Sequence, residues 1–79
     1  MNKAKDTRTF RQVWQSLDTV GKADLTKYLY EKAFVAAGTI YQWAAETRNP
    51  KAINRRMVVA GLKELFSINA SAETLFPNR

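Results

Sequence analysis

Residues 36–50 read AAGTIYQWAAETRNP, and this stretch decides the fold because it joins a short helical pattern to a clear stop. Ile40 and Trp43 share the inner face of a helix that we expect over about 37–46, with Trp43 in the core. Pro50 excludes helical backbone for the residue before it, so the helix is over by then. Small residues at its start and a large aromatic near its end predict a helix with a buried back and an exposed front.

Apolar spacing on both sides of this stretch predicts three further helices and a closing turn. Their expected ranges are about 10–17, 22–33 and 51–66, followed by a short turn that Ser71 caps and that holds Leu75 and Phe76. Asp6 or Thr7 is placed to cap the first helix, and residues 18–21 are expected to separate it from the second. No run alternates as a strand does, so the predicted fold is all-α, a small four- to five-helix bundle.

The composition limits the possible functions. The 79 residues suit a single domain, which we expect over residues 7–79 behind a disordered basic N-terminus at 1–6. Cysteine and histidine are both absent from the sequence. Thiolate metal sites and histidine catalysis are therefore excluded, and we expect no enzyme, no cofactor and no small-molecule substrate.

Charge points to a class of partner. Thirteen Lys and Arg against seven Asp and Glu give a net charge of +6. Nucleic acid and anionic membrane surfaces are the usual partners of such a chain, although added solubility is the plainer explanation. The basic residues are spread over several predicted helices, which disfavours a membrane-surface helix. No apolar run spans a bilayer and no signal peptide is recognisable, so we expect a soluble cytoplasmic protein.

The order of several residues resembles the Cro and phage-repressor (XRE) type of helix-turn-helix protein. The matching residues are Leu29, Val35, the run TIYQW at 39–43 and the run RNP at 48–50. The spacing from Trp43 to Pro50 is also that of the family, and the resemblance extends over residues 25–77. It implies a lambda-repressor-like fold and a phage or bacterial DNA-binding regulator of transcription.

The sequence departs from the family at the turn between the two helices of the motif. The family's turn glycine falls on Phe34, and phenylalanine with positive φ is strained, so we expect a different turn or a longer first helix. The family's alanine falls on Tyr30 and its next leucine on Ala33, an exchange of bulk that can compensate in packing. Ala36 replaces the serine that opens the recognition helix, which removes a capping or phosphate-binding hydroxyl.

The resemblance also implies which residues would contact double-stranded DNA, with the helix over about 37–46 in the major groove. The residues expected to face the bases are Gln42, Tyr41, Gly38 and Ala37. Of these, Gln42 carries an amide that can pair with adenine N6 and N7, and Tyr41 can touch a thymine methyl or a phosphate. The residues expected to contact phosphate are Thr26, Lys27, Thr39, Arg48, Asn49 and Lys51.

Two further expectations concern partners. The apolar residues of the helix over 51–66 wrap more than half of its circumference, and Val59 and Phe66 point away from Ile53. We therefore expect a spare apolar side that, with the closing turn, forms a symmetric homodimer. The alternative function is a helix-turn-helix protein-interaction module, such as an antitoxin or adaptor, because Ala37 and its neighbours offer little to read bases with.

Overall fold

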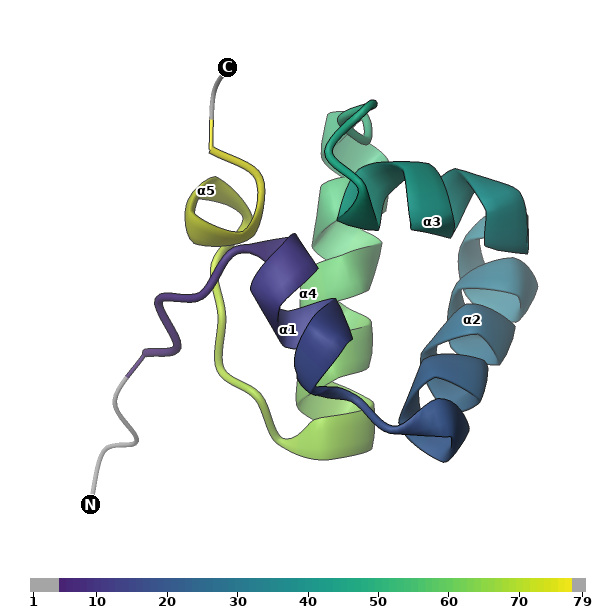
Figure 1. The fold of residues 1–79 in the computed structure, drawn as a ribbon, viewed down its shortest axis with the longest axis horizontal. Coiled ribbons are helices and arrows are strands. Elements are labelled where there is room, and N and C mark those ends of the chain that lie inside the picture. The colour runs from purple at the N-terminus through teal and green to yellow at the C-terminus, as the bar shows by residue number, and fades with distance from the viewer. Residues whose placement is uncertain (1–4, 78–79) are drawn as a thin grey trace.

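The computed structural model describes residues 5–77, and Figure 1 shows how the helices of this part of the chain pack together. Its helices are α1 (Phe10–Ser16), α2 (Thr19–Ala33), α3 (Ala37–Ala44), α4 (Ala52–Phe66) and α5 (Ala72–Leu75). The described residues contain no strand, which confirms the all-α prediction. None of these helices is long and apolar enough to cross a membrane.

The first helix begins at Phe10 as expected, but its cap is not the residue that was predicted. Thr9, rather than Asp6 or Thr7, is its N-cap, and its Oγ1 accepts the backbone N–H of Gln12 at 3.3 Å. The Gln12 side chain in turn accepts the backbone N–H of Thr9 at 3.0 Å. This reciprocal capping box satisfies two backbone donors at once, which explains why the helix starts here.

The separation between the first two helices is shorter than predicted. Asp18 does not prolong a break through residues 18–21, because its Oδ1 accepts the backbone N–H of Gly21 at 2.7 Å and caps α2. The second helix therefore begins at Thr19 and is 15 residues long. Its first turn precedes Lys22, where the apolar spacing alone had placed the start.

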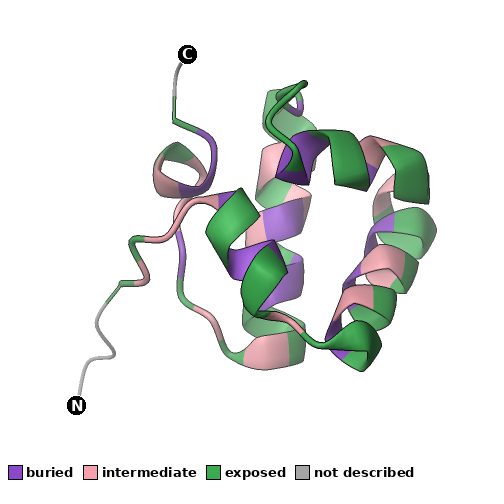
Figure 2. Ribbon diagram, in the orientation of Figure 1, coloured by how far each residue is buried: buried purple, intermediate pink, exposed green. Residues whose placement is uncertain are grey.

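The core lies where the helices converge, and Figure 2 shows buried segments turned toward the centre of the bundle. The largest fully buried side chains are Phe10, Val13, Leu25, Leu29, Ile40, Val58, Leu62 and Leu75. Trp43 is 3% exposed, which confirms its predicted place in the core. The longest helices, α2 and α4, pack along each other. Helix α3 packs against α2 and α5 packs against α4, while α1 packs against α3 and α5.

The closing turn belongs to the core of the monomer and not to a spare surface. Leu75 is fully buried, and the ring of Phe76 stacks on Phe10 with centroids 5.3 Å apart. Val59 and Phe66 are half-buried and also pack against the core. Leu75 and Phe76 are therefore not available to the predicted dimer surface, because α5 folds back and covers one side of the bundle.

The N-terminal segment is attached to the other end of the chain. Residues 1–4, part of the predicted disordered segment, lie outside the described residues. The backbone N–H of Asp6 donates to the carbonyl of Asn69 at 2.7 Å, within an isolated parallel bridge between Asp6 and Ala70. Arg8 forms a salt bridge with Asp6 at 2.6 Å, and its hydrogen bonds lower the pKa of that carboxyl group.

Candidate functional site

The connection between α2 and α3 is a tight turn with a left-handed residue. Phe34 ends α2 with φ 57° and ψ 33°, and its N–H donates to the carbonyl of Tyr30 at 3.1 Å. The N–H of Val35 donates to the carbonyl of Leu29 at 3.2 Å, and the Val35 side chain is buried. These two bonds hold the backbone left-handed although residue 34 is not glycine. The expectation of a different turn or a longer helix was therefore wrong.

One face of α3, its back, is buried in the core, and the opposite face, its front, is exposed to solvent. Ile40, Trp43 and Ala44 are buried, whereas the residues between them on the helix face solvent. Ala36 is the N-cap and makes no side-chain hydrogen bond to the first turn, as expected from the missing hydroxyl. The helix ends at Ala44, slightly before the predicted 46.

The four residues predicted to face bases lie together on the front of α3. Ala37, Gly38, Tyr41 and Gln42 are all exposed. A Cβ added at Gly38 would meet nothing within 4 Å, so the helix surface is bare there. The carbonyl of Gln42 accepts both the N–H and the hydroxyl of Thr47, at 3.0 and 3.2 Å, while the amide side chain remains exposed.

The residues predicted to contact phosphate do not form one cluster. Arg48, Asn49 and Lys51 are exposed beyond the C-terminal end of α3, in the connection to α4. That connection is held because Arg55 Nε donates to the carbonyl of Pro50 at 2.9 Å. The cations Arg48 and Lys51 therefore lie near the C-terminal end of α3, whereas the turn from α2 precedes its N-terminal end.

Three other predicted phosphate contacts lie nearer the start of α3. Thr39 is half-buried on α3, while Thr26 and Lys27 lie in the interior of α2 rather than at its start as the resemblance implied. The hydroxyl of Thr26 donates to the carbonyl of Lys22 at 2.7 Å. Because a hydroxyl has a single proton, Thr26 has none left to donate to a phosphate oxygen.

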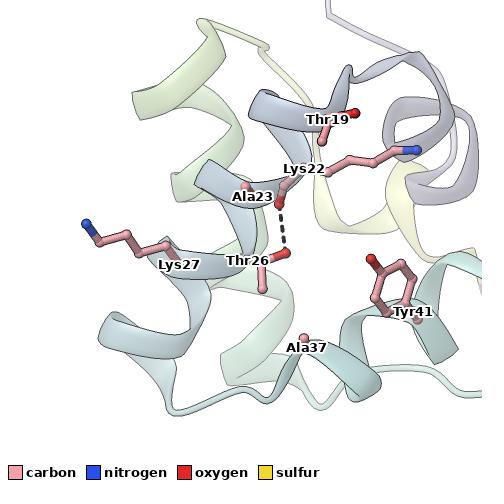
Figure 3. Close-up of a pocket in the computed structure, with 7 residues that line it drawn as sticks. All are labelled: Thr19, Lys22, Ala23, Thr26, Lys27, Ala37 and Tyr41. Atoms are coloured by element: carbon pink, nitrogen blue, oxygen red, sulfur yellow. Dashed lines mark hydrogen bonds between the residues drawn. The ribbon is translucent and has the colours of Figure 1, made fainter.

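A hollow of about 530 Å³ lies between α2 and the front of α3 (Figure 3). Its lining residues are Thr19, Lys22, Ala23, Thr26, Lys27, Ala37 and Tyr41. Figure 3 shows the Lys22 side chain extending toward the Tyr41 side of the hollow and Lys27 extending to the opposite side. The hollow thus joins residues predicted as base contacts to residues predicted as phosphate contacts.

Sequence reasoning missed the face that Lys22 shares with Thr19, because it began the helix at residue 22 and left Thr19 outside it. Asp18 as an N-cap would have extended the helix and put Thr19, Ala23 and Thr26 on one face, with Lys22 beside it. The aspartate followed by helical residues is the signal that could have revealed this face.

Trp14 supports two of the residues that line the hollow. Its ring meets the Tyr41 ring edge to face, with centroids 5.5 Å apart and an interplanar angle of 88°. The ammonium of Lys22 lies 5.8 Å from the centroid of the Trp14 ring, within range of a cation–π attraction. Trp14 is itself buried, so both side chains pack against a ring that is held in place by the core.

The chemical groups of this face come from the hollow and from the front of α3. The residues lining the hollow supply ammonium and hydroxyl groups and no carboxylate, and the front of α3 adds the Gln42 amide. Such groups bind phosphate oxygens and the edges of bases. No protein-family model, curated protein or solved structure matches this chain.

Proposed function

We propose that the chain is a sequence-specific regulator of transcription that binds double-stranded DNA, with α2 and α3 acting as a helix-turn-helix of the Cro and phage-repressor type. In this proposal α3 enters the major groove, and α2 lies across the sugar-phosphate backbone. In this proposal the regulator acts by occupying its operator.

The observation that carries the proposal is the two-sided character of α3. Its back is anchored by Ile40 and Trp43, and its front presents a bare start followed by Tyr41 and Gln42. A rigid, short helix with an exposed front fits a groove about 12 Å wide. The absence of side-chain bulk at Gly38 allows the helix start to approach the DNA closely.

Specificity in this proposal comes mainly from Gln42. Its amide is the one side chain on the exposed front of α3 that can form a bidentate pair with adenine. The exposed cations Arg48 and Lys51, with Asn49 between them and Lys27 on α2, supply phosphate contacts. With these three cations on phosphates, the logarithm of affinity should fall with the logarithm of salt concentration with a slope of roughly −2.7.

A symmetric homodimer completes the proposal, since operators with two half-sites require one. Its surface excludes Leu75 and Phe76, which are buried within the monomer. A dilution series by sedimentation, with and without the DNA site, tests this part. A monomer at every concentration in both conditions contradicts it.

The decisive experiment selects bound sequences from a pool of random duplex DNA, for the parent protein and for Gln42→Ala. We expect an enriched palindromic site that loses its preference at one position per half-site in the variant. Gln15→Ala is the matched control, because Gln15 is an exposed glutamine on α1 rather than on α3. The control should select the parent site unchanged.

A second candidate is a protein-interaction module with the same fold. The observation in its favour is a pair of exposed aromatic residues near the turn, with Phe34 91% and Tyr30 64% exposed. Large exposed aromatics are typical of protein interfaces. Weak binding to every DNA sequence, with no enriched site, would favour this candidate over the regulator.

A further inference from the structure

We propose that the hollow between α2 and α3 holds one phosphodiester group of the DNA strand, gripped by the Lys22 ammonium and the Tyr41 hydroxyl. This inference rests on the proposed function and deepens it, because it adds a contact and commits Tyr41 to the backbone rather than to a base. Trp14 serves as the positioning residue on which both side chains rest.

The composition of the hollow selects an anionic occupant. Two of its lining residues are lysines, and no acidic residue lines it. Another hollow on the described surface, of about 360 Å³, differs because its lining contains both a cation, Arg55, and a carboxylate, Glu73. A phosphate group is attracted by the first hollow, whereas the carboxylate in the second opposes it.

The position of the hollow selects DNA as the source of that phosphate. It opens between the front of α3 and the side of α2, and Ala37 and Tyr41 belong to both the hollow and the predicted base-reading face. A strand whose bases meet Gln42 must therefore pass its backbone close to this hollow. A free phosphate ion would bind no more tightly because the hollow lies next to the base-reading face.

The grip is prepared before DNA arrives. Lys22 and Tyr41 come from different helices, yet each contacts the buried ring of Trp14, on α1. A side chain already held in place loses less conformational entropy on binding than one that is free. The ammonium retains three N–H donors while it lies over the ring, so it can still bind a phosphate oxygen.

Tyr41 is assigned to the backbone by the same contact. The edge-to-face packing against Trp14 fixes the plane of its ring, and Figure 3 shows its hydroxyl directed toward the side of the hollow where Lys22 lies. A ring held in this way cannot follow the edge of a base. Loss of the hydroxyl should therefore weaken binding of every sequence equally.

The test measures affinity over a salt series for two duplexes, the site enriched by selection and poly(dI-dC). The variants are Lys22→Gln, Tyr41→Phe and both together, with Lys63→Gln on the exposed side of α4 as the control. We expect Lys22→Gln to weaken both duplexes by the same factor and to make the salt slope shallower by about 0.9. The control should leave the slope unchanged.

The double variant distinguishes one shared phosphate from two separate contacts. If Lys22 and Tyr41 grip the same group, their losses combine to less than the product of the single factors. Lys22→Gln combined with Arg48→Gln should instead multiply, because Arg48 lies outside the hollow. Multiplicative losses for Lys22 with Tyr41 overturn the shared grip.

The remaining outcomes separate the inference from the function on which it rests. An enriched site with an unchanged slope in Lys22→Gln overturns the grip and leaves the regulator standing. A relaxed preference at one base in Tyr41→Phe also overturns it, because Tyr41 then reads sequence. No binding of either duplex by the parent protein overturns both proposals. Thermal unfolding of each variant confirms that the fold is retained.

Discussion

The ring of Tyr28 occupies the space that a side chain on Gly61 would need. A Cβ at Gly61 would lie 2.9 Å from Cδ1 and 3.0 Å from Cε1 of Tyr28. The same Cβ would lie 3.3 Å from Cδ1 of Leu25, which is on α2 like Tyr28, so two side chains of α2 crowd this position. The missing side chain at Gly61 thus sets how closely α2 and α4 approach, and α3 packs against α2.

Alanine substitutions at two helical glycines should therefore have opposite effects on stability. Gly61→Ala should lower the free energy of unfolding by about 1–2 kcal/mol, because the Tyr28 ring must move within a packed interface. Gly38→Ala should raise it by about 0.5–1 kcal/mol, because the new methyl group meets nothing and alanine favours a helix. Urea unfolding of both variants measures the difference. Equal stabilities would contradict the close approach of α2 and α4.

Gly38→Ala should also separate stability from binding. If the start of α3 lies close to DNA, the added methyl group weakens binding to the enriched duplex while the fold becomes more stable. Unchanged affinity would mean that the helix start keeps its distance from the duplex. Filter binding and thermal unfolding on the same preparation give both numbers.

Substitutions at Phe34 should expose the strain of its backbone. A non-glycine residue in the left-handed region costs about 1–2 kcal/mol, and glycine removes most of this cost while adding flexibility to the unfolded chain. We expect Phe34→Gly to gain about 0.5–1 kcal/mol in unfolding free energy. Phe34→Ala keeps the Cβ and loses only an exposed ring, so it should stay within about 0.5 kcal/mol of the parent. A stabilising alanine variant would contradict this explanation.

A hydroxyl at the uncapped start of α3 should stabilise the domain. The hydroxyl introduced by Ala36→Ser can accept the backbone N–H of Gly38, and we expect this variant to gain about 1 kcal/mol. For a chain of this size that gain corresponds to about 4–8 °C in melting temperature. Ala37→Ser places the same group one residue inside the helix, where it cannot cap, and should not stabilise the fold. A higher melting temperature for Ala37→Ser than for Ala36→Ser would count against the helix start seen here.

The pair formed by Asp6 and Arg8 should make stability depend on acid. Hydrogen bonds from Arg8 lower the pKa of Asp6 below its usual 3.8, so the folded state favours the charged carboxylate. The resulting stabilisation is present above pH 3.8 and is lost as the pH falls through the lower pKa of the folded state. The free energy of unfolding of Asp6→Asn should therefore fall less steeply than that of the parent as the pH drops below 3.8. Arg8→Gln should show the same shallower dependence. Urea unfolding at a series of acid pH values measures the slopes.

Apolar periodicity was sufficient to predict the helices and their buried faces. The spacing of Phe10, Val13 and Trp14, and the stop at Pro50, depend only on nearby residues, and the structure agrees with both. Helix starts were less well predicted because several residues that can act as an N-cap lie close together in the sequence, such as Asp6, Thr7 and Thr9. The pattern of Thr9 and Gln12 was present in the sequence and would have identified the first start.

The errors arose where the packing of the folded chain overrides the preference of a single residue. Phe34 adopts a conformation that its own preferences oppose, because backbone bonds and the buried Val35 fix the turn. Leu75 and Phe76 look like free apolar residues until the chain returns to Phe10. The contact of Trp14 with Tyr41 and Lys22 joins three helices, so no local pattern could reveal it.

The stacking of Phe76 on Phe10 has a consequence for the way the protein is made. Residue 10 leaves the ribosome well before its packing partner, residue 76, is added. Until residue 76 is made this stack cannot form, so the apolar faces of α1 and α3 stay accessible to chaperones and proteases. Closing of the core must therefore wait for α5, and the yield of folding in the cell should depend on how quickly α5 finds α1.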